Sequence, residues 1–176
     1  PAPGGGAALT GLAVVRSLTG GNVGALRLGG PGPHGRRSGV VHIVTESPEA
    51  AYERGQQLCS LLADQGKLDV NSVVDRDLAE TFPESARRAY DVHPLIANVL
   101  DDPEINIELH PKWAPNITTT LGRFVGRTVG VVATNPMRLG GCLASASADK
   151  AVRFLRLSDS FRTPPLVPLA VPDVRP

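Results

Sequence analysis

The chain has 176 residues, of which 41% are hydrophobic and only 4% aromatic, so one aliphatic core is within its reach. Eighteen basic and seventeen acidic residues give a net charge of +1, which provides no general attraction to nucleic acid. Cys59 and Cys142 lack metal-ligand spacing, and neither a leader nor a membrane-length apolar run is evident. These features predict a cytoplasmic protein with no bound metal and with neither nucleic acid nor membrane as a partner.

Glycine and proline residues divide the first two thirds of the chain into short elements. Ser47 followed by Pro48 predicts the start of a helix that ends before Gly66. The remaining expected elements are a disordered tail over 1–7, helices over 12–18, 84–90 and 94–100, a loop over 29–39, a strand over 40–45 and a polar linker over 67–84.

The most regular pattern lies between Asn116 and Val171. Alternating residues over 116–124 predict a strand, Val125-Gly126 a hairpin turn, and the continuous apolar run over 127–133 a strand covered on both faces. A helix is expected from an N-cap at Ser147 to about Phe161. Its core-facing stripe is expected to consist of Ala148, Ala151, Val152, Leu155 and Ser158, with Lys150 facing away from the core. The apolar run over 166–171 then predicts a βαβ unit with a parallel crossover.

Several spaced motifs in this chain resemble one enzyme family. They occur in order as Leu28-Gly29-Gly30-Pro31, Ser38-Gly39-Val40-Val41-His42, Arg88-Ala89-Tyr90-Asp91-Val92, Trp113-Ala114-Pro115, Gly126-Arg127-Thr128-Val129-Gly130-Val131-Val132-Ala133, Asn135-Pro136, Gly140-Gly141-Cys142-Leu143 and Lys150-Ala151-Val152-Arg153-Phe154. Together they resemble the carboxyltransferase (β) subunit of biotin-dependent acyl-CoA carboxylases of the acetyl-/propionyl-CoA type.

This resemblance implies an α/β fold built from crotonase (ClpP)-like ββα spiral units, here partial or shortened. Residues 8–66 would be a remnant of the N-terminal half, 67–115 a linker with short helices, and 116–176 the start of the C-terminal half. The implied reaction transfers carboxylate from carboxybiotin, held on a carrier protein, to a short acyl-CoA through an enolate stabilised by backbone N–H groups. The implied partners are acyl-CoA, a biotin-carrying α subunit and further copies of the same chain, with no cofactor bound by the chain itself.

The chain departs from the family pattern where the chemistry is concentrated. Neither the Ser-Gly-Gly-Ala type turn nor the downstream Gly-Gly-Ala type turn, which provide the family's oxyanion donors, occurs in the sequence. We therefore expect no carboxyl transfer by this chain alone. Two alternatives stay open: a small repurposed enzyme, such as a decarboxylase, cyclase or isomerase of a biosynthetic pathway, and a non-catalytic interaction module.

Candidate site residues fall into two groups. His42 and Asp91 are possible acid–base groups, although a histidine satisfied within the packing and a helix cap are the simpler interpretations. Asn135, Arg138, Gly140 and Gly141 are expected to contact CoA or biotin, because glycines permit close backbone approach and arginine binds phosphate. The alternative for this second group is a tight turn whose glycines only provide positive φ angles.

Overall fold

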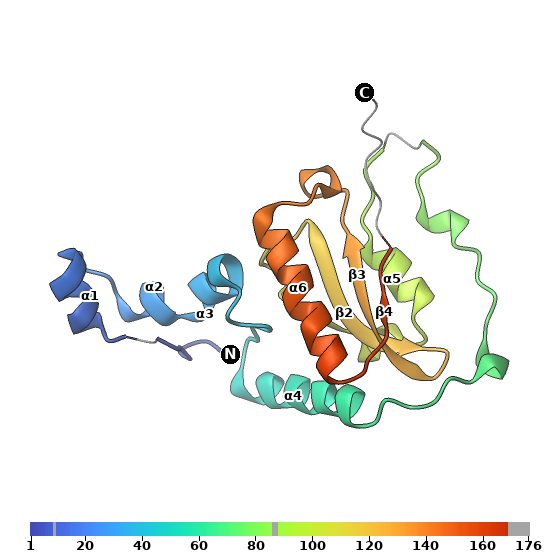
Figure 1. The fold of residues 1–176 in the computed structure, drawn as a ribbon, viewed down its shortest axis with the longest axis horizontal. Helices are drawn as coiled ribbons and strands as arrows, with labels where there is room; N and C mark the ends of the chain where they lie inside the picture. Colours follow the sequence, from blue (N-terminus) through green and yellow to red (C-terminus); the bar gives the residue numbers. More distant parts are fainter. Residues whose placement is uncertain (9, 86–87, 169–176) are drawn as a thin grey trace.

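The structure, a computed structural model, describes residues 1–8, 10–85 and 88–168. The fold is centred on a mixed four-stranded sheet (Figure 1). The strands lie in the order β1-β2-β3-β4, with antiparallel pairing up to β3 and parallel pairing between β3 and β4. Their bounds are Ile107–Leu109 (β1), Ile117–Phe124 (β2), Arg127–Thr134 (β3) and Pro165–Leu166 (β4). The predicted hairpin and parallel crossover are confirmed, β1 was not predicted, and residues 169–171 of the predicted last strand lie outside the described residues.

The hairpin between β2 and β3 turns through two left-handed residues. Val125 has a φ of 51° and Gly126 one of 79°, as a two-residue turn of this type requires. The Asp101 carboxylate accepts hydrogen bonds from both backbone N–H groups at 2.8 Å. Asp101 therefore anchors the turn.

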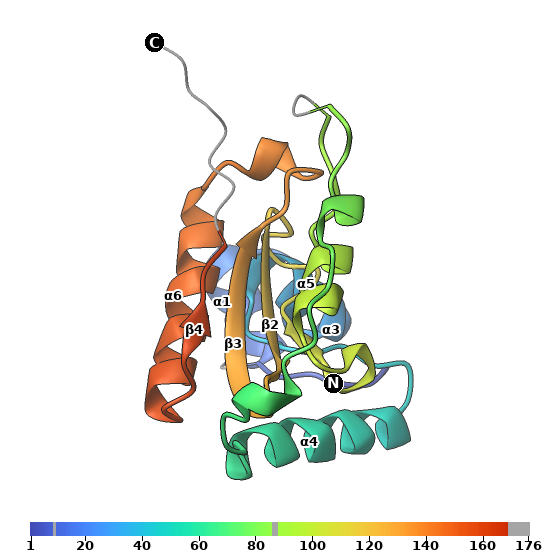
Figure 2. The same ribbon diagram turned by 90° about the vertical axis from the view of Figure 1, so that its right-hand side faces the viewer.

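Three helices cover the sheet, with α6 (Ser145–Ser160) and α5 (His93–Val99) on opposite faces (Figure 2). α4 (Pro48–Ala63) begins at the predicted Ser47 cap, whose hydroxyl accepts a hydrogen bond from the Ala50 N–H. Two clusters of buried side chains form the core. The first combines Leu61 of α4, Phe154 of α6, and Ile107, Leu109, Ile117, Leu121 and Val132 of the sheet. The second combines Val92, Ile96 and Leu100 in and around α5 with Val129, Val131 and Ala133 of β3.

The buried face of α6 differs from the predicted face. The helix begins at Ser145 rather than after Ser147, and its fully buried residues are Ser147, Lys150, Phe154 and Ser158. Val152 and Leu155, which were expected to face the core, are 48% and 37% exposed. The prediction that Lys150 points to solvent is wrong, because its amine reaches backbone carbonyl groups under the helix.

Short helices occur within residues 10–38, beside the sheet (Figure 1). These are α1 (Leu12–Thr19), α2 (Ala25–Gly29), α3 (Pro31–Pro33) and a π-helical turn over His34–Ser38. The loop expected over 29–39 is therefore helical in part. Residues 1–7 contact this region through hydrogen bonds from the Ala7 N–H to the Gly29 carbonyl and from the Thr45 N–H to the Pro1 carbonyl.

Two predicted elements are absent from the described residues. Residues 40–45 form an irregular segment, here called the strap, instead of a strand. Among the described residues, the strap makes a single backbone hydrogen bond next to β1, from the His110 N–H to the His42 carbonyl, which is too few for a strand. Residues 84, 85 and 88–90 are not helical. Between Gly66 and β1, the described residues contain α5 and three single 3-10 turns, at Val70–Ser72, Ala79–Thr81 and Pro103–Ile105. Within the described ranges, no helix has both the length and the apolar character needed to cross a bilayer.

Candidate functional site

The candidate site is the loop of residues 135–144, which joins the carboxyl end of β3 to the N-terminus of α6 (Figure 1). In α/β proteins this end of a parallel βα unit is the usual place for ligands. The first N–H groups of a helix have no intrahelical acceptor, and here the N-cap residue Ala144 has no polar side chain to satisfy them. The start of α6 therefore presents hydrogen-bond donors and a positive dipole end to the loop.

Asn116, at the start of β2, fixes the far end of the loop. Its side-chain amide donates to the Cys142 carbonyl at 2.7 Å and to the Ser147 hydroxyl at 2.9 Å. Ser147 in turn accepts from the Ala144 N–H and donates to the Ala144 carbonyl, both at 2.7 Å. Asn116 and Ser147 are both buried, so they hold the loop against the helix from below.

The middle of the loop is exposed and has an unusual backbone. Leu139, Gly140 and Gly141 have consecutive φ angles of 51°, 61° and 75°, so the predicted glycines do occupy left-handed positions. Arg138 is exposed, and Gly140 has open space where a side chain would lie. Leu139 is 72% exposed. The loop thus presents backbone, one cation and apolar side chains to solvent.

Asn135 and Asp91, which the sequence places 44 residues apart, are in contact. The Asn135 amide donates to the Asp91 carboxylate at 3.2 Å, and Asn135 also accepts from the Met137 N–H at 3.1 Å. The same Asp91 oxygen accepts from the His93 N–H at 3.2 Å, so Asp91 also satisfies the start of α5 as the simpler interpretation expected. The structure therefore brings Asp91 to the base of the loop.

His93 links this contact to the edge strand. Its Nδ1 lies 2.5 Å from Asp91 and its Nε2 lies 3.3 Å from Glu108 on β1. The hydrogen bond with Glu108, and then that with Asp91, outweigh burial and raise the pKa of His93 to about 9. Burial would raise the pKa of Asp91, but its bonds with His93 and Asn135 lower it. At neutral pH His93 is therefore an imidazolium clamped between Asp91 and Glu108, and the lowered pKa makes Asp91 a weaker base.

Lys150 supports the connection between β1 and β2. Its side chain is fully buried, and its amine donates to the Ile117 carbonyl at 2.6 Å and to the His110 carbonyl at 2.9 Å. Burial lowers the pKa of Lys150 to about 8, and the negative charge of Glu108 opposes this shift. The amine positions the backbone next to Asn116, which holds the loop.

His42 does not join the loop. Its ring lies against the His110 ring, with centroids 4.3 Å apart, and His110 contacts Trp113. Arg153 lies over the Trp113 ring and donates to the Gly39 carbonyl at 3.1 Å. The structure therefore separates His42 from the other five predicted site residues. No group of three or more potential metal ligands occurs within the described ranges.

Sequence reasoning missed Asn116, Lys150, His93 and His110 as contributors to these two regions. A buried lysine has no local signal, because its acceptors come from distant parts of the chain. One signal was present: Asn116 immediately precedes a strand, where polar side chains can reach a neighbouring helix start.

The comparisons with known proteins all indicate the same family. The family model described as "Carboxyl transferase domain" matches residues 5–173. The biotin-dependent acetyl-/propionyl-coenzyme A carboxylase beta6 subunit of Mycobacterium tuberculosis is 48% identical over 170 residues, which cover 96% of this chain and 36% of that protein. The propionyl-CoA carboxylase beta chain of Rhodococcus erythropolis is 44% identical over 180 residues, covering 99% and 38%. The chain thus spans little more than a third of the length of these relatives.

Two further matches concern structure and chemistry. The transcarboxylase 12S structure, a hexamer with methylmalonyl-coenzyme A bound, superposes with a TM-score of 0.83 at 32% identity, covering 98% of this chain and 36% of that one. The methylmalonyl-CoA decarboxylase subunit alpha of Veillonella parvula is 34% identical over 164 residues, covering 89% and 32%. These matches confirm the predicted resemblance and the crotonase-like α/β fold.

Proposed function

Because the chain belongs to the carboxyl transferase family, we propose that it contributes part of a site that transfers carboxylate between carboxybiotin and a short acyl-CoA. The matched family and the relatives named as biotin-dependent carboxylase subunits support this proposal. In it, residues 8–66 form the end of one half of the family domain, 116–176 the start of the other half, and 67–115 the connection.

In this proposal the 135–144 loop binds an anionic part of acyl-CoA or biotin. The observation that carries it is the position of Arg138 on the exposed loop that leads into α6. The first N–H groups of this helix receive no bond from the side chain of the N-cap residue Ala144, and both these groups and a guanidinium favour negative charge. The left-handed backbone at Gly140 and Gly141 permits close approach of a ligand. Asn135 and Asp91 then act as positioning residues that fix the start of the loop.

Carboxybiotin, carried by a partner protein, would supply the carboxylate, and this chain's residues would orient the acceptor. Stabilisation of the enolate needs paired backbone N–H donors aimed at the developing oxyanion. The sequence contains neither of the family's two oxyanion turns. The 176-residue chain is therefore expected to bind acyl-CoA without turning it over, and measurable carboxyl transfer by this chain alone would contradict the need for these oxyanion donors.

Calorimetric titration of propionyl-CoA into the chain tests the assignment of the loop. Arg138→Gln removes the cation and is expected to weaken binding about five-fold, as a partly exposed arginine–phosphate contact allows. Arg156→Gln is the matched control, because Arg156 is an exposed arginine near the opposite end of α6. Equal affinities of the two variants would show that the loop is not the site.

A second candidate function is decarboxylation, which the similarity to the methylmalonyl-CoA decarboxylase subunit favours. A repurposed small enzyme of this kind would release CO₂ from methylmalonyl-CoA without a biotin-carrying partner. Release of CO₂ by the purified chain would support this alternative and contradict the need for additional oxyanion donors.

A further inference from the structure

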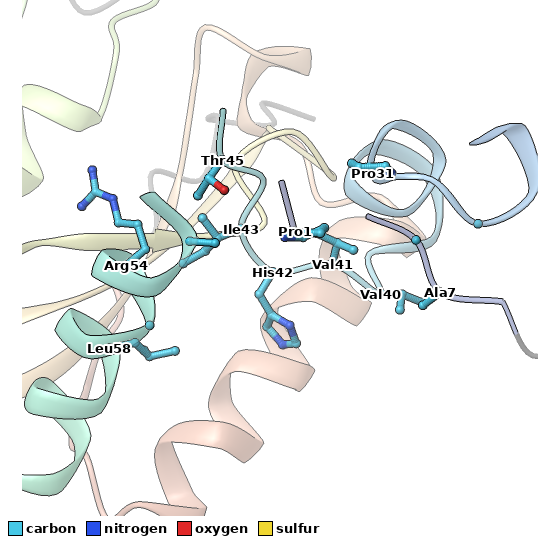
Figure 3. A pocket seen from close by; sticks show the side chains of 14 residues that line it. Pro1, Ala7, Pro31, Val40, Val41, His42, Ile43, Thr45, Arg54 and Leu58 are labelled. Carbon is cyan, nitrogen blue, oxygen red and sulfur yellow. The ribbon is translucent and has the colours of Figure 1, made fainter. Parts of the chain in front are cut away.

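A cavity of about 430 Å³ lies apart from the 135–144 loop, between α4, the strap of residues 40–45 and the segment around Ala7 (Figure 3). This volume is within the range of ordinary small-molecule sites. Its walls are mainly aliphatic and include Val40 and Ile43 of the strap and Leu58 of α4. A ligand seated there would bury an aliphatic group.

His42 is the polar group best placed to orient such a ligand. In Figure 3 its ring lies between Leu58 on one side and Val40 on the other, whereas the Arg54 guanidinium points away from the other lining side chains. The His42 ring forms no hydrogen bond with a described residue, and burial, followed by the charge of Arg153, lowers its pKa. A neutral imidazole with a free N–H is therefore available at the cavity wall.

The surroundings of His42 favour a negatively charged group. Its neighbour His110 is 3% exposed, and neither ring nitrogen has a partner in hydrogen-bonding geometry, although the Gly39 carbonyl is close enough to act on its pKa. Burial, followed by the charges of His42, Lys150 and Arg153, lowers the pKa of His110 to about 4. No described residue that lines the cavity is acidic. An excess of nearby positive charge and a cavity wall without acidic residues both favour an anionic ligand next to His42.

We propose that this cavity binds a short aliphatic carboxylate, with its chain against Val40, Ile43 and Leu58 and its carboxylate accepting a hydrogen bond from His42. This inference goes beyond the proposed carboxyltransferase function, since none of the 135–144 loop residues lines the cavity. Either proposal can therefore fail without the other.

Gly55 offers a way to fill the cavity without disturbing the fold. It lines the cavity from the middle of α4, and a Cβ added there meets no atom within 4 Å. Leucine is also a better helix former than glycine, so Gly55→Leu is expected to fold. Gln56→Leu is the matched control, because it adds the same side chain at an exposed neighbouring position that does not line the cavity.

The test is calorimetric titration of hexanoate into the chain and these variants, with hexanamide as a neutral ligand of the same length. We expect hexanoate to bind with a Kd of about 1 mM, which is ordinary for so small a ligand, and hexanamide to bind more weakly. Gly55→Leu and His42→Phe should each weaken hexanoate binding about ten-fold or more, while Gln56→Leu should not. Absence of hexanoate binding, equal binding of hexanamide, or unchanged affinity in Gly55→Leu would overturn the proposal.

Discussion

Replacing Lys150 with methionine should change how the stability of the fold depends on pH. The amine has an ordinary pKa of 10.5, and burial lowers the pKa of Lys150 to about 8 in the fold. Between these values the unfolded chain binds more protons than the folded chain, so the free energy of unfolding rises with pH. At about 1.4 kcal/mol per pH unit, the rise specific to this group is about 3 kcal/mol.

Urea unfolding at about pH 7.5 and about pH 10.5 measures this effect. The stability of the wild type relative to Lys150→Met should increase by about 3 kcal/mol across that interval. At the lower pH the variant leaves the Ile117 carbonyl without its Lys150 donor, at about 1–3 kcal/mol, whereas the His110 carbonyl keeps the Trp113 N–H as a donor. The variant also removes a buried charge. Lys112→Met, at an exposed position in the same connection, should follow the wild type. Parallel pH profiles for the wild type and Lys150→Met would refute the argument.

Three further substitutions test other contacts by urea unfolding. His93→Gln should remove a contribution to the free energy of unfolding that is complete below pH 6.5 and is lost as pH rises through about 9. Because His93 is nearly half exposed, we expect this contribution to be less than about 1 kcal/mol, and an unchanged pH profile would contradict the clamp. Gly39→Ala should lower stability by about 3 kcal/mol or more, since its Cβ would lie 2.3 Å from the Trp113 ring at a φ of 62°. Gly140→Ala has a similar φ of 61° but open space around the Cβ, so it should lower stability by only about 1 kcal/mol, and equal losses would exclude a steric cause. Asp101→Ala should cost about 1–3 kcal/mol by freeing two N–H groups of the hairpin turn, and a neutral result would show that water replaces the carboxylate.

The elements with strong local signals could be predicted from the sequence. The β2–β3 hairpin follows from alternating and continuous apolar runs around Val125-Gly126, and α4 follows from Ser47-Pro48. The left-handed glycines of the 135–144 loop were also predictable, because glycine pairs after a buried strand favour such turns. In each case the residues that decide the conformation are adjacent in the chain.

The remaining features depend on partners far away in the sequence. Lys150 is buried because its amine reaches carbonyls 40 and 33 residues earlier, which helical spacing alone cannot reveal. The strap over 40–45 has an alternating pattern but gains too few backbone partners to form a strand. The pairing of His42 with His110, and of Asp91 with Asn135, likewise appears only once the chain is folded.

The central claim, that the 135–144 loop and the start of α6 form an anion-binding part of a carboxyltransferase site, is most directly tested by amide NMR shifts during titration with propionyl-CoA. The account predicts that the largest shifts occur at Arg138, Gly140, Gly141 and Ser145, with small shifts at the opposite end of α6 near Ser160. Shifts confined to other parts of the chain, or no shifts at saturating ligand, would contradict it.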